Sequence, residues 1–149
     1  MTRDPRYDIL FEPVQIGPLT ARNRFFQAPH CNGMGHLLPG GVAAMRGVKA
    51  EGGWAVVATE ECDIHPENDV SPAPEARLWD DGDAERMALT AAAIHEHGSL
   101  AAIEITHNGH AAGNRYSRLP IGTVSDLPQK SYDPVQCYAM SKKDMTGLI

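Results

Sequence analysis

Three short apolar runs, each ending abruptly in reactive polar side chains, constrain this 149-residue chain more than any other feature. The runs occupy residues 24–29, 54–59 and 100–103. They lead into His30–Cys31, Glu60–Glu61–Cys62 and Glu104–Ile105–Thr106–His107. Helical patterns separate them, and strands that alternate with helices build a parallel sheet with its chemistry at the carboxyl ends of the strands. The order of residues therefore predicts an α/β fold with one shared site.

The remaining elements can also be placed from local signals. Residues 14–24 are typical of a small hairpin, and a glycine-rich loop is expected over 33–41. The two helices are predicted at about 42–51, ending at Gly52–Gly53, and at about 84–97, capped by Asp80 or Asp81. We expect long irregular segments at 62–80 and 109–138, and a helix that starts at Ser141.

Three parallel strands with two helices make an open sheet with a bare edge and a partly bare face. A closed barrel of eight such units needs about 250 residues. The sequence therefore predicts a hairpin and three βα units that form either an N-terminal piece of something larger or a half that needs a partner.

Composition excludes several classes of protein. The net charge is −6, and no basic face is apparent, which argues against a nucleic-acid partner. No apolar run approaches the ~20 residues that span a bilayer, and the first residues lack the apolar region of a signal peptide. Three cysteines without framework spacing favour a reducing compartment, and we expect a cytoplasmic protein.

Each polar cluster has a functional and a plain structural interpretation. Cys31 is placed to be an exposed thiolate whose pKa a neighbouring cation would lower, although free cysteines usually behave as small buried hydrophobes. Glu60 and Glu61 point to opposite faces of a strand, so only one can face the site. Glu104 lies in an apolar strand, where a carboxylate needs a donor, and it shares a face with Thr106.

A zinc site is a further alternative. The pairs Cys62–His65 and His107–His110 have ligand-like spacing, but the gaps match no finger or ribbon and both pairs fall in predicted loops. We therefore expect no metal ligands in this chain.

The motifs resemble the opening of the old yellow enzyme (NADH:flavin oxidoreductase) family. Within that family they are similar to the trimethylamine/dimethylamine dehydrogenase branch. The matching segments are residues 9–17, 22–25, 29–31, 49–54, 59–60 and 77–80. The resemblance runs from about Arg3 to the end of the chain. It implies a (β/α)8 barrel that binds FMN at its C-terminal face, with residues 1–149 as the N-terminal part of that domain.

The resemblance also implies roles for particular residues. Ala28, Pro29 and His30 match the stretch along the flavin, and Cys31 matches a cysteine that bonds covalently to the flavin C6. Glu61 matches a position beside the flavin and the substrate, and Glu104 matches a side chain that hydrogen-bonds the flavin ring. The implied reaction is oxidative demethylation or deamination of a small alkylamine, with electrons passed to flavin.

Two positions depart from the pattern of the trimethylamine enzymes. Glu61 replaces a tyrosine of an aromatic cage, and Thr106 replaces a tryptophan. A cage works by cation–π attraction, whereas a carboxylate makes an ion pair or accepts from an N–H donor. We therefore expect Glu61 and Thr106 to bind a primary or secondary ammonium substrate.

Other parts of the family's machinery match nothing in this chain. No catalytic proton-handling residue, flavin-phosphate site or iron–sulfur ligand has a counterpart here, so we expect the chain to be inactive alone. For the intact enzyme the resemblance implies an electron-transfer flavoprotein-like acceptor and a homo-oligomer. The alternatives are an NAD(P)H-dependent flavin oxidoreductase or ene-reductase of the same family, and a non-catalytic docking subunit.

Overall fold

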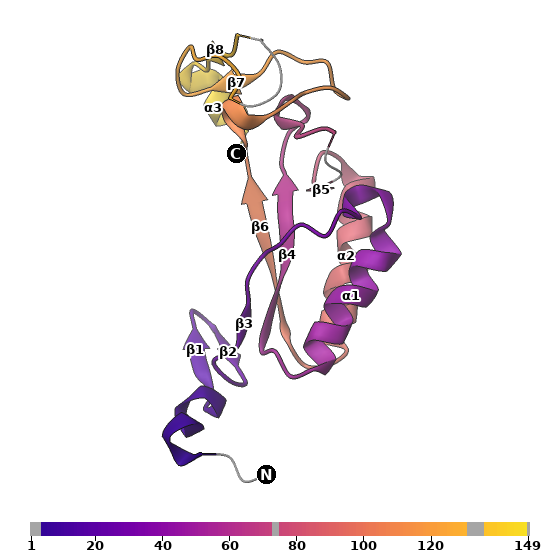
Figure 1. The fold of residues 1–149 in the computed structure, drawn as a ribbon, viewed down its shortest axis with the longest axis vertical. Coiled ribbons are helices and arrows are strands. Elements are labelled where there is room, and N and C mark those ends of the chain that lie inside the picture. Colours follow the sequence, from indigo (N-terminus) through magenta and orange to yellow (C-terminus); the bar gives the residue numbers. More distant parts are fainter. Residues whose placement is uncertain (1–3, 73–74, 131–135, 149) are drawn as a thin grey trace.

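A parallel sheet with two helices packed on one face forms the centre of the molecule (Figure 1). The computed structural model describes residues 4–72, 75–130 and 136–148. Strand β4 (Val56–Asp63) pairs in parallel with β3 (Phe26–Gln27) and with β6 (Leu100–Thr106). Residues 55–60 are all buried, as expected for an apolar strand in the middle of a parallel sheet.

Helices α1 (Pro39–Glu51) and α2 (Asp81–His95) lie side by side against this sheet (Figure 1). They approach closely because Gly47 has no side chain: a Cβ built there would lie 3.4 Å from Ala93 Cβ. Ala50, Val57 and Ile94, each almost fully buried, form the core between helices and sheet. At the start of α2 the Asp80 carboxylate accepts from the backbone N–H of Asp83 at 2.9 Å, the predicted cap.

The N-terminal segment lies at the opposite end of the molecule from α3 (Figure 1). It consists of a 3₁₀ helix, η1 (Pro5–Phe11), and the antiparallel pair β1 (Val14–Ile16) and β2 (Leu19–Ala21). Gly17 turns between these strands with φ 55°, a left-handed conformation that suits glycine.

Arg22, directly after β2, joins this segment to the ends of both helices. Its guanidinium donates to the carbonyls of Ala50 at 2.9 Å and His97 at 2.8 Å, and to Ser99 Oγ at 3.1 Å. Carbonyls at helix C-termini lack partners within the helix, so a cation there satisfies them and complements the helix dipole.

Short elements collect around the carboxyl ends of β4 and β6 (Figure 1). They are η2 (Gly35–Leu37), η3 (Pro66–Asn68), β5 (Ala76–Arg77), η4 (Gly109–Ala111), β7 (Gly122–Thr123), β8 (Tyr138–Ala139) and α3 (Lys142–Gly147). β5 pairs in parallel with the end of β4. Ser141 and Asp144 form the predicted capping box of α3.

Strand β6 lies at one side of the sheet, and its second half is uncovered. Ile103, Glu104 and Ile105 are all exposed, so both faces of the strand are open there. This agrees with the expected bare edge. Among the described residues, no helix has the length and apolar character needed to cross a membrane.

Several predicted boundaries are wrong. The second strand was expected over 54–59 but runs from Val56 to Asp63, so Cys62 lies inside it and is buried. The segment expected to be irregular at 62–80 contains β5 and η3, and one of its prolines, Pro74, lies outside the described residues.

Candidate functional site

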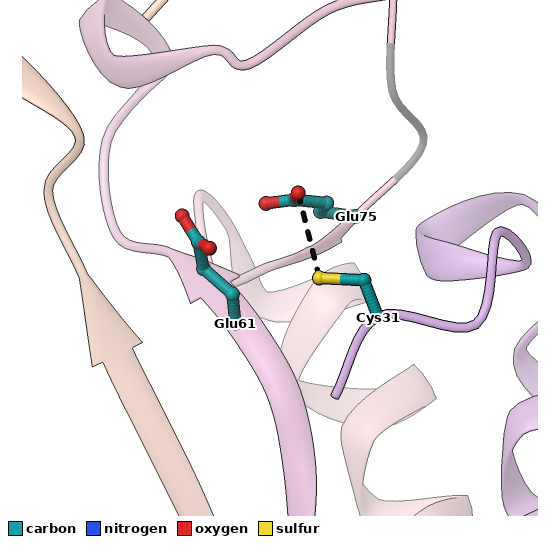
Figure 2. A group of neighbouring side chains, drawn as sticks. All are labelled: Cys31, Glu61 and Glu75. Carbon is teal, nitrogen blue, oxygen red and sulfur yellow. Dashed lines mark hydrogen bonds between the residues drawn. The ribbon is translucent and has the colours of Figure 1, made fainter. Parts of the chain in front are cut away.

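Cys31, Glu61 and Glu75 come together from three separate segments (Figure 2). Cys31 follows β3, Glu61 lies near the end of β4, and Glu75 immediately precedes β5. One ligand-type atom from each side chain lies within 4.8 Å of the others, and Cys31 Sγ donates to Glu75 Oε1 at 3.5 Å. The carboxyl ends of the neighbouring parallel strands β3 and β4 therefore bring Cys31 and Glu61 together, and the residue before β5 completes the cluster.

The state of the Cys31 thiol differs from the expectation. Its side chain is exposed, as predicted, but partial loss of hydration and the nearby carboxylates of Glu75 and Glu60 raise its pKa to about 12. The charge of buried Arg46 also reaches Cys31, but burial and the carboxylates outweigh it. The expected thiolate is therefore wrong for this state of the protein, and Cys31 carries its proton at neutral pH.

Glu75 is the member of the cluster that sequence reasoning missed. Burial, followed by the charge of Glu61, raises its pKa to about 7. Glu75 Oε2 and Glu61 Oε1 are buried atoms without a hydrogen-bond partner among the described residues. Unpaired buried carboxylate oxygens are costly, so these two indicate where a donor group would bind. The proline-rich stretch around Glu75 gave no periodic signal that could have singled it out.

Glu104 and Thr106 lie beside this cluster on the next strand. Glu61 and Glu104 are register partners across β4 and β6, and Thr106 pairs with Asp63 in the same way. The three residues Cys31, Glu61 and Glu104 therefore converge at one rim of the sheet. Glu104 is exposed, however, so the expected need for a donor inside an apolar strand does not hold in this chain.

The segment Ala28–Pro29–His30 reaches from β3 to Cys31 and rests on buried polar side chains. The Ala28 carbonyl accepts from the Gln27 side chain. The His30 carbonyl accepts from Arg46 Nη2 at 2.7 Å. Arg46 is fully buried.

Of the two adjacent glutamates, Glu60 is the one that turns away into the interior. It is fully buried and accepts from the backbone N–H of Asn32 at 3.1 Å. Burial raises the pKa of Glu60, and the charge of Arg46 opposes that change. Glu61 is left to face the rim, as the predicted division of roles requires.

Among the described residues, the spacing-based zinc pairs belong to no group of three close ligand atoms. Cys62 is buried in β4, whereas His65 Nδ1 and His107 Nε2 lie 3.9 Å and 4.0 Å from Glu67 Oε1. In the part of the chain that the structure describes, only Cys31, Glu61 and Glu75 bring three metal-type ligand atoms together.

Comparison with known proteins places the chain in a family. Residues 9–149 match the family described as NADH:flavin oxidoreductase / NADH oxidase. The chain belongs to this family. It is an α/β chain that matches part of the TIM-barrel enzymes of the old yellow enzyme family.

Amine-oxidising enzymes are among the similar members of the family. Dimethylamine dehydrogenase of Hyphomicrobium sp. (strain x) is 52% identical over 130 residues, which cover 87% of this chain and 17% of that protein. The structure of histamine dehydrogenase from Rhizobium sp. 4-9 matches with a TM-score of 0.94 and 44% identity over 98% of this chain and 23% of that one. The chain thus spans about a fifth of the length of these relatives.

A more distant member of the same fold is morphinone reductase. Its structure matches with a TM-score of 0.79 over 93% of this chain and 42% of that one, at 19% identity. At that level of identity the similarity concerns the fold alone.

Proposed function

We propose that this chain contributes one rim of the active site of an FMN-dependent amine dehydrogenase. Ala28, Pro29, His30, Cys31 and Glu104 would contact the flavin, and Glu61 and Thr106 would bind the substrate. The convergence of Cys31, Glu61 and Glu75 at neighbouring strand ends carries this proposal. The similarity to a dimethylamine and a histamine dehydrogenase supports the substrate class.

The residues fit the requirements of an FMN ring. An exposed sulfur is accessible to a planar cofactor, and the exposed Glu104 carboxylate on β6 is available to a ring N–H. The unpaired buried oxygens of Glu61 and Glu75 can accept from donors of the ring or of the substrate. When bound, FMN accepts the two electrons removed from the amine.

Glu61 would hold the substrate by its charge. A primary or secondary ammonium presents N–H donors, and a charge-assisted hydrogen bond to a carboxylate is about twice as strong as a neutral one. A quaternary-like cation offers no such donor and prefers an aromatic cage. The side chain at position 61 therefore favours a small amine that keeps at least one N–H.

Cys31 would anchor the cofactor covalently. The test is the mass of the denatured polypeptide that carries this chain, after purification from cells grown with riboflavin. We expect a gain of one FMN less two hydrogens, and its loss in Cys31→Ser. Flavin released quantitatively on denaturation would instead favour the NAD(P)H-dependent flavin oxidoreductase alternative.

The remaining parts of the proposal concern the intact enzyme. We propose that electrons leave the flavin through an iron–sulfur cluster held outside residues 1–149 to a soluble flavoprotein acceptor. Reduction of the flavin by dimethylamine under anaerobic conditions would test the substrate class without the acceptor. Reduction by NADH but by no small alkylamine would overturn it.

A further inference from the structure

We propose that Glu75 is the general base that removes the Cys31 proton when the protein bonds its own flavin. This inference rests on the proposed covalent attachment and adds the residue that makes it possible. Its starting point is a conflict in the site: the cysteine that would form the bond is a protonated thiol surrounded by carboxylates. A thiolate is the nucleophile in such reactions, so the proton must be taken by a nearby group.

The geometry selects Glu75 among the neighbouring groups. The Cys31 thiol donates to Glu75 Oε1 at 3.5 Å (Figure 2). The other Glu75 oxygen is buried without a partner in the described part of the chain, so no donor there competes for it. Glu75 therefore touches the reacting sulfur and has the capacity to accept a proton.

Glu60 and His30, two other potential bases, are committed elsewhere. Glu60 accepts from the backbone of Asn32, on the interior side of the segment. The His30 ring nitrogen Nδ1 lies 3.1 Å from Arg46 Nη1 and 3.1 Å from Gln27 Nε2, so it already faces two donors.

The backbone at Glu75 is held in place, which a base requires. The Glu75 carbonyl accepts from both the backbone N–H and Nδ1 of His36, each at 3.0 Å. The next residue, Ala76, begins β5 and pairs with Cys62 of β4. These contacts hold the Glu75 backbone in place, and its carboxylate lies within hydrogen-bond reach of the sulfur.

The pKa values of Glu75 and Cys31 suit a slow reaction that each protein molecule performs only once. The Glu75 pKa is raised to about 7, near the value that makes a general base effective at neutral pH. Transfer from a thiol with a pKa of about 12 is uphill, and bond formation makes it irreversible. The thiol proton passes to Glu75, the sulfur bonds to the flavin carbon and that carbon loses its hydrogen as a proton. The two electrons released stay on the flavin until dioxygen removes them.

Replacing Glu75 should change two measurable properties of Cys31 in opposite directions. In the flavin-free protein, Glu75→Gln removes a negative charge beside the sulfur, which lowers the thiol pKa and speeds alkylation by iodoacetamide at pH 7.5. In the flavin-loaded protein the same substitution removes the base, so covalent attachment should slow on the order of 10²-fold. Within residues 1–149 the alkylation assay, read by peptide mapping, reports on Cys31 because Cys62 and Cys137 are buried.

Glu85→Gln is the matched control, since it removes an exposed carboxylate on α2 that does not belong to the cluster. We expect it to attach flavin at the wild-type rate, and Glu75→Asp to attach it at an intermediate rate. Acceleration of both alkylation and attachment in Glu75→Gln would overturn the proposal, because Glu75 would then act only as a repulsive charge. A wild-type protein without covalent flavin would instead reject the proposed attachment itself.

Discussion

Arg46 holds His30 by two contacts, from Nη2 to the backbone carbonyl at 2.7 Å and from Nη1 to the ring Nδ1 at 3.1 Å. On the other side of Cys31, Glu60 accepts from the backbone of Asn32. Arg46 and Glu60 are both fully buried. The backbone before and after the reactive cysteine is thus tied to two interior side chains of opposite charge.

Arg46→Met should therefore loosen the cysteine segment and destabilise the fold. Removing one partner from a buried ionic network costs about 3–5 kcal/mol, because the other charge stays buried without compensation. Urea unfolding of the protein measures the loss. Arg46→Lys should recover part of it, and Lys49→Met on the same helix should cost under about 1 kcal/mol. Equal losses for Arg46→Met and Lys49→Met would contradict this role.

Glu61→Gln should weaken substrate binding in the flavin-loaded enzyme. The neutral amide keeps a hydrogen-bond acceptor but loses the ion pair, which corresponds to roughly a tenfold rise in KM for a secondary amine. Steady-state kinetics with dimethylamine provide the measurement. Glu85→Gln, an exposed carboxylate on α2, should leave KM unchanged. Unaltered kinetics in Glu61→Gln would remove Glu61 from the substrate site.

Asp63 should make stability depend on pH. Burial, then the charges of Glu75 and Glu61, raises its pKa from 3.8 to about 8, so the folded state holds a proton that the unfolded chain releases. The unfolding free energy should therefore fall as pH rises from about 4 to 8, and this contribution is fully present only below pH 4.

Asp63→Asn tests this assignment. Asp63 Oδ1 accepts from the side-chain amides of Asn68 at 3.2 Å and Asn108 at 3.0 Å, and an asparagine oxygen can keep both bonds. The variant should show a flatter stability profile between pH 4 and 8 in urea titrations. Asp81→Asn, at an exposed position on α2, should retain the wild-type slope. An unchanged slope in Asp63→Asn would show that other groups set the dependence.

Arg22→Lys should destabilise the end of the molecule opposite the site. The guanidinium of arginine reaches the carbonyls of Ala50 and His97 together with Ser99. The compact ammonium group of lysine cannot span all three acceptors. We expect a loss of roughly 2 kcal/mol in urea unfolding. Arg24→Lys is the control, because Arg24 Nε makes one exposed bond to the Ile9 carbonyl. A larger loss of unfolding free energy in Arg24→Lys than in Arg22→Lys would contradict the stabilising role assigned to Arg22.

The sequence predicted the repeating elements because their signals are local. The apolar stretch at 54–59, the stop at Gly52–Gly53 and the Asp80 cap each act within a few residues, and α1, β4 and α2 appear close to where they were expected. Errors occurred where pairing between strands decides how long an element is. β4 continues to Asp63 because β6 and β5 supply partners there, although the residues after 59 are polar.

The site was predictable only in part, for the same reason. The alternation of strands and helices locates the strand ends, and this allowed the positions of Cys31, Glu61 and Glu104 to be predicted. Glu75 joins them through a long loop, and no spacing in the chain encodes that approach. Burial and, after it, the charge of Glu75 raise the pKa of the Cys31 thiol, so two features that the local sequence does not encode reversed the expected direction of that pKa.

The uncovered half of β6 affects how the chain must be handled. Ile103 and Ile105 expose apolar surface on a strand whose outer side is free to recruit another backbone. Such a strand is a template for aggregation, and added polypeptide that pairs with it removes the hazard. Light scattering that grows with protein concentration, and falls when Ile105 is replaced by lysine, would identify this strand as the origin of self-association.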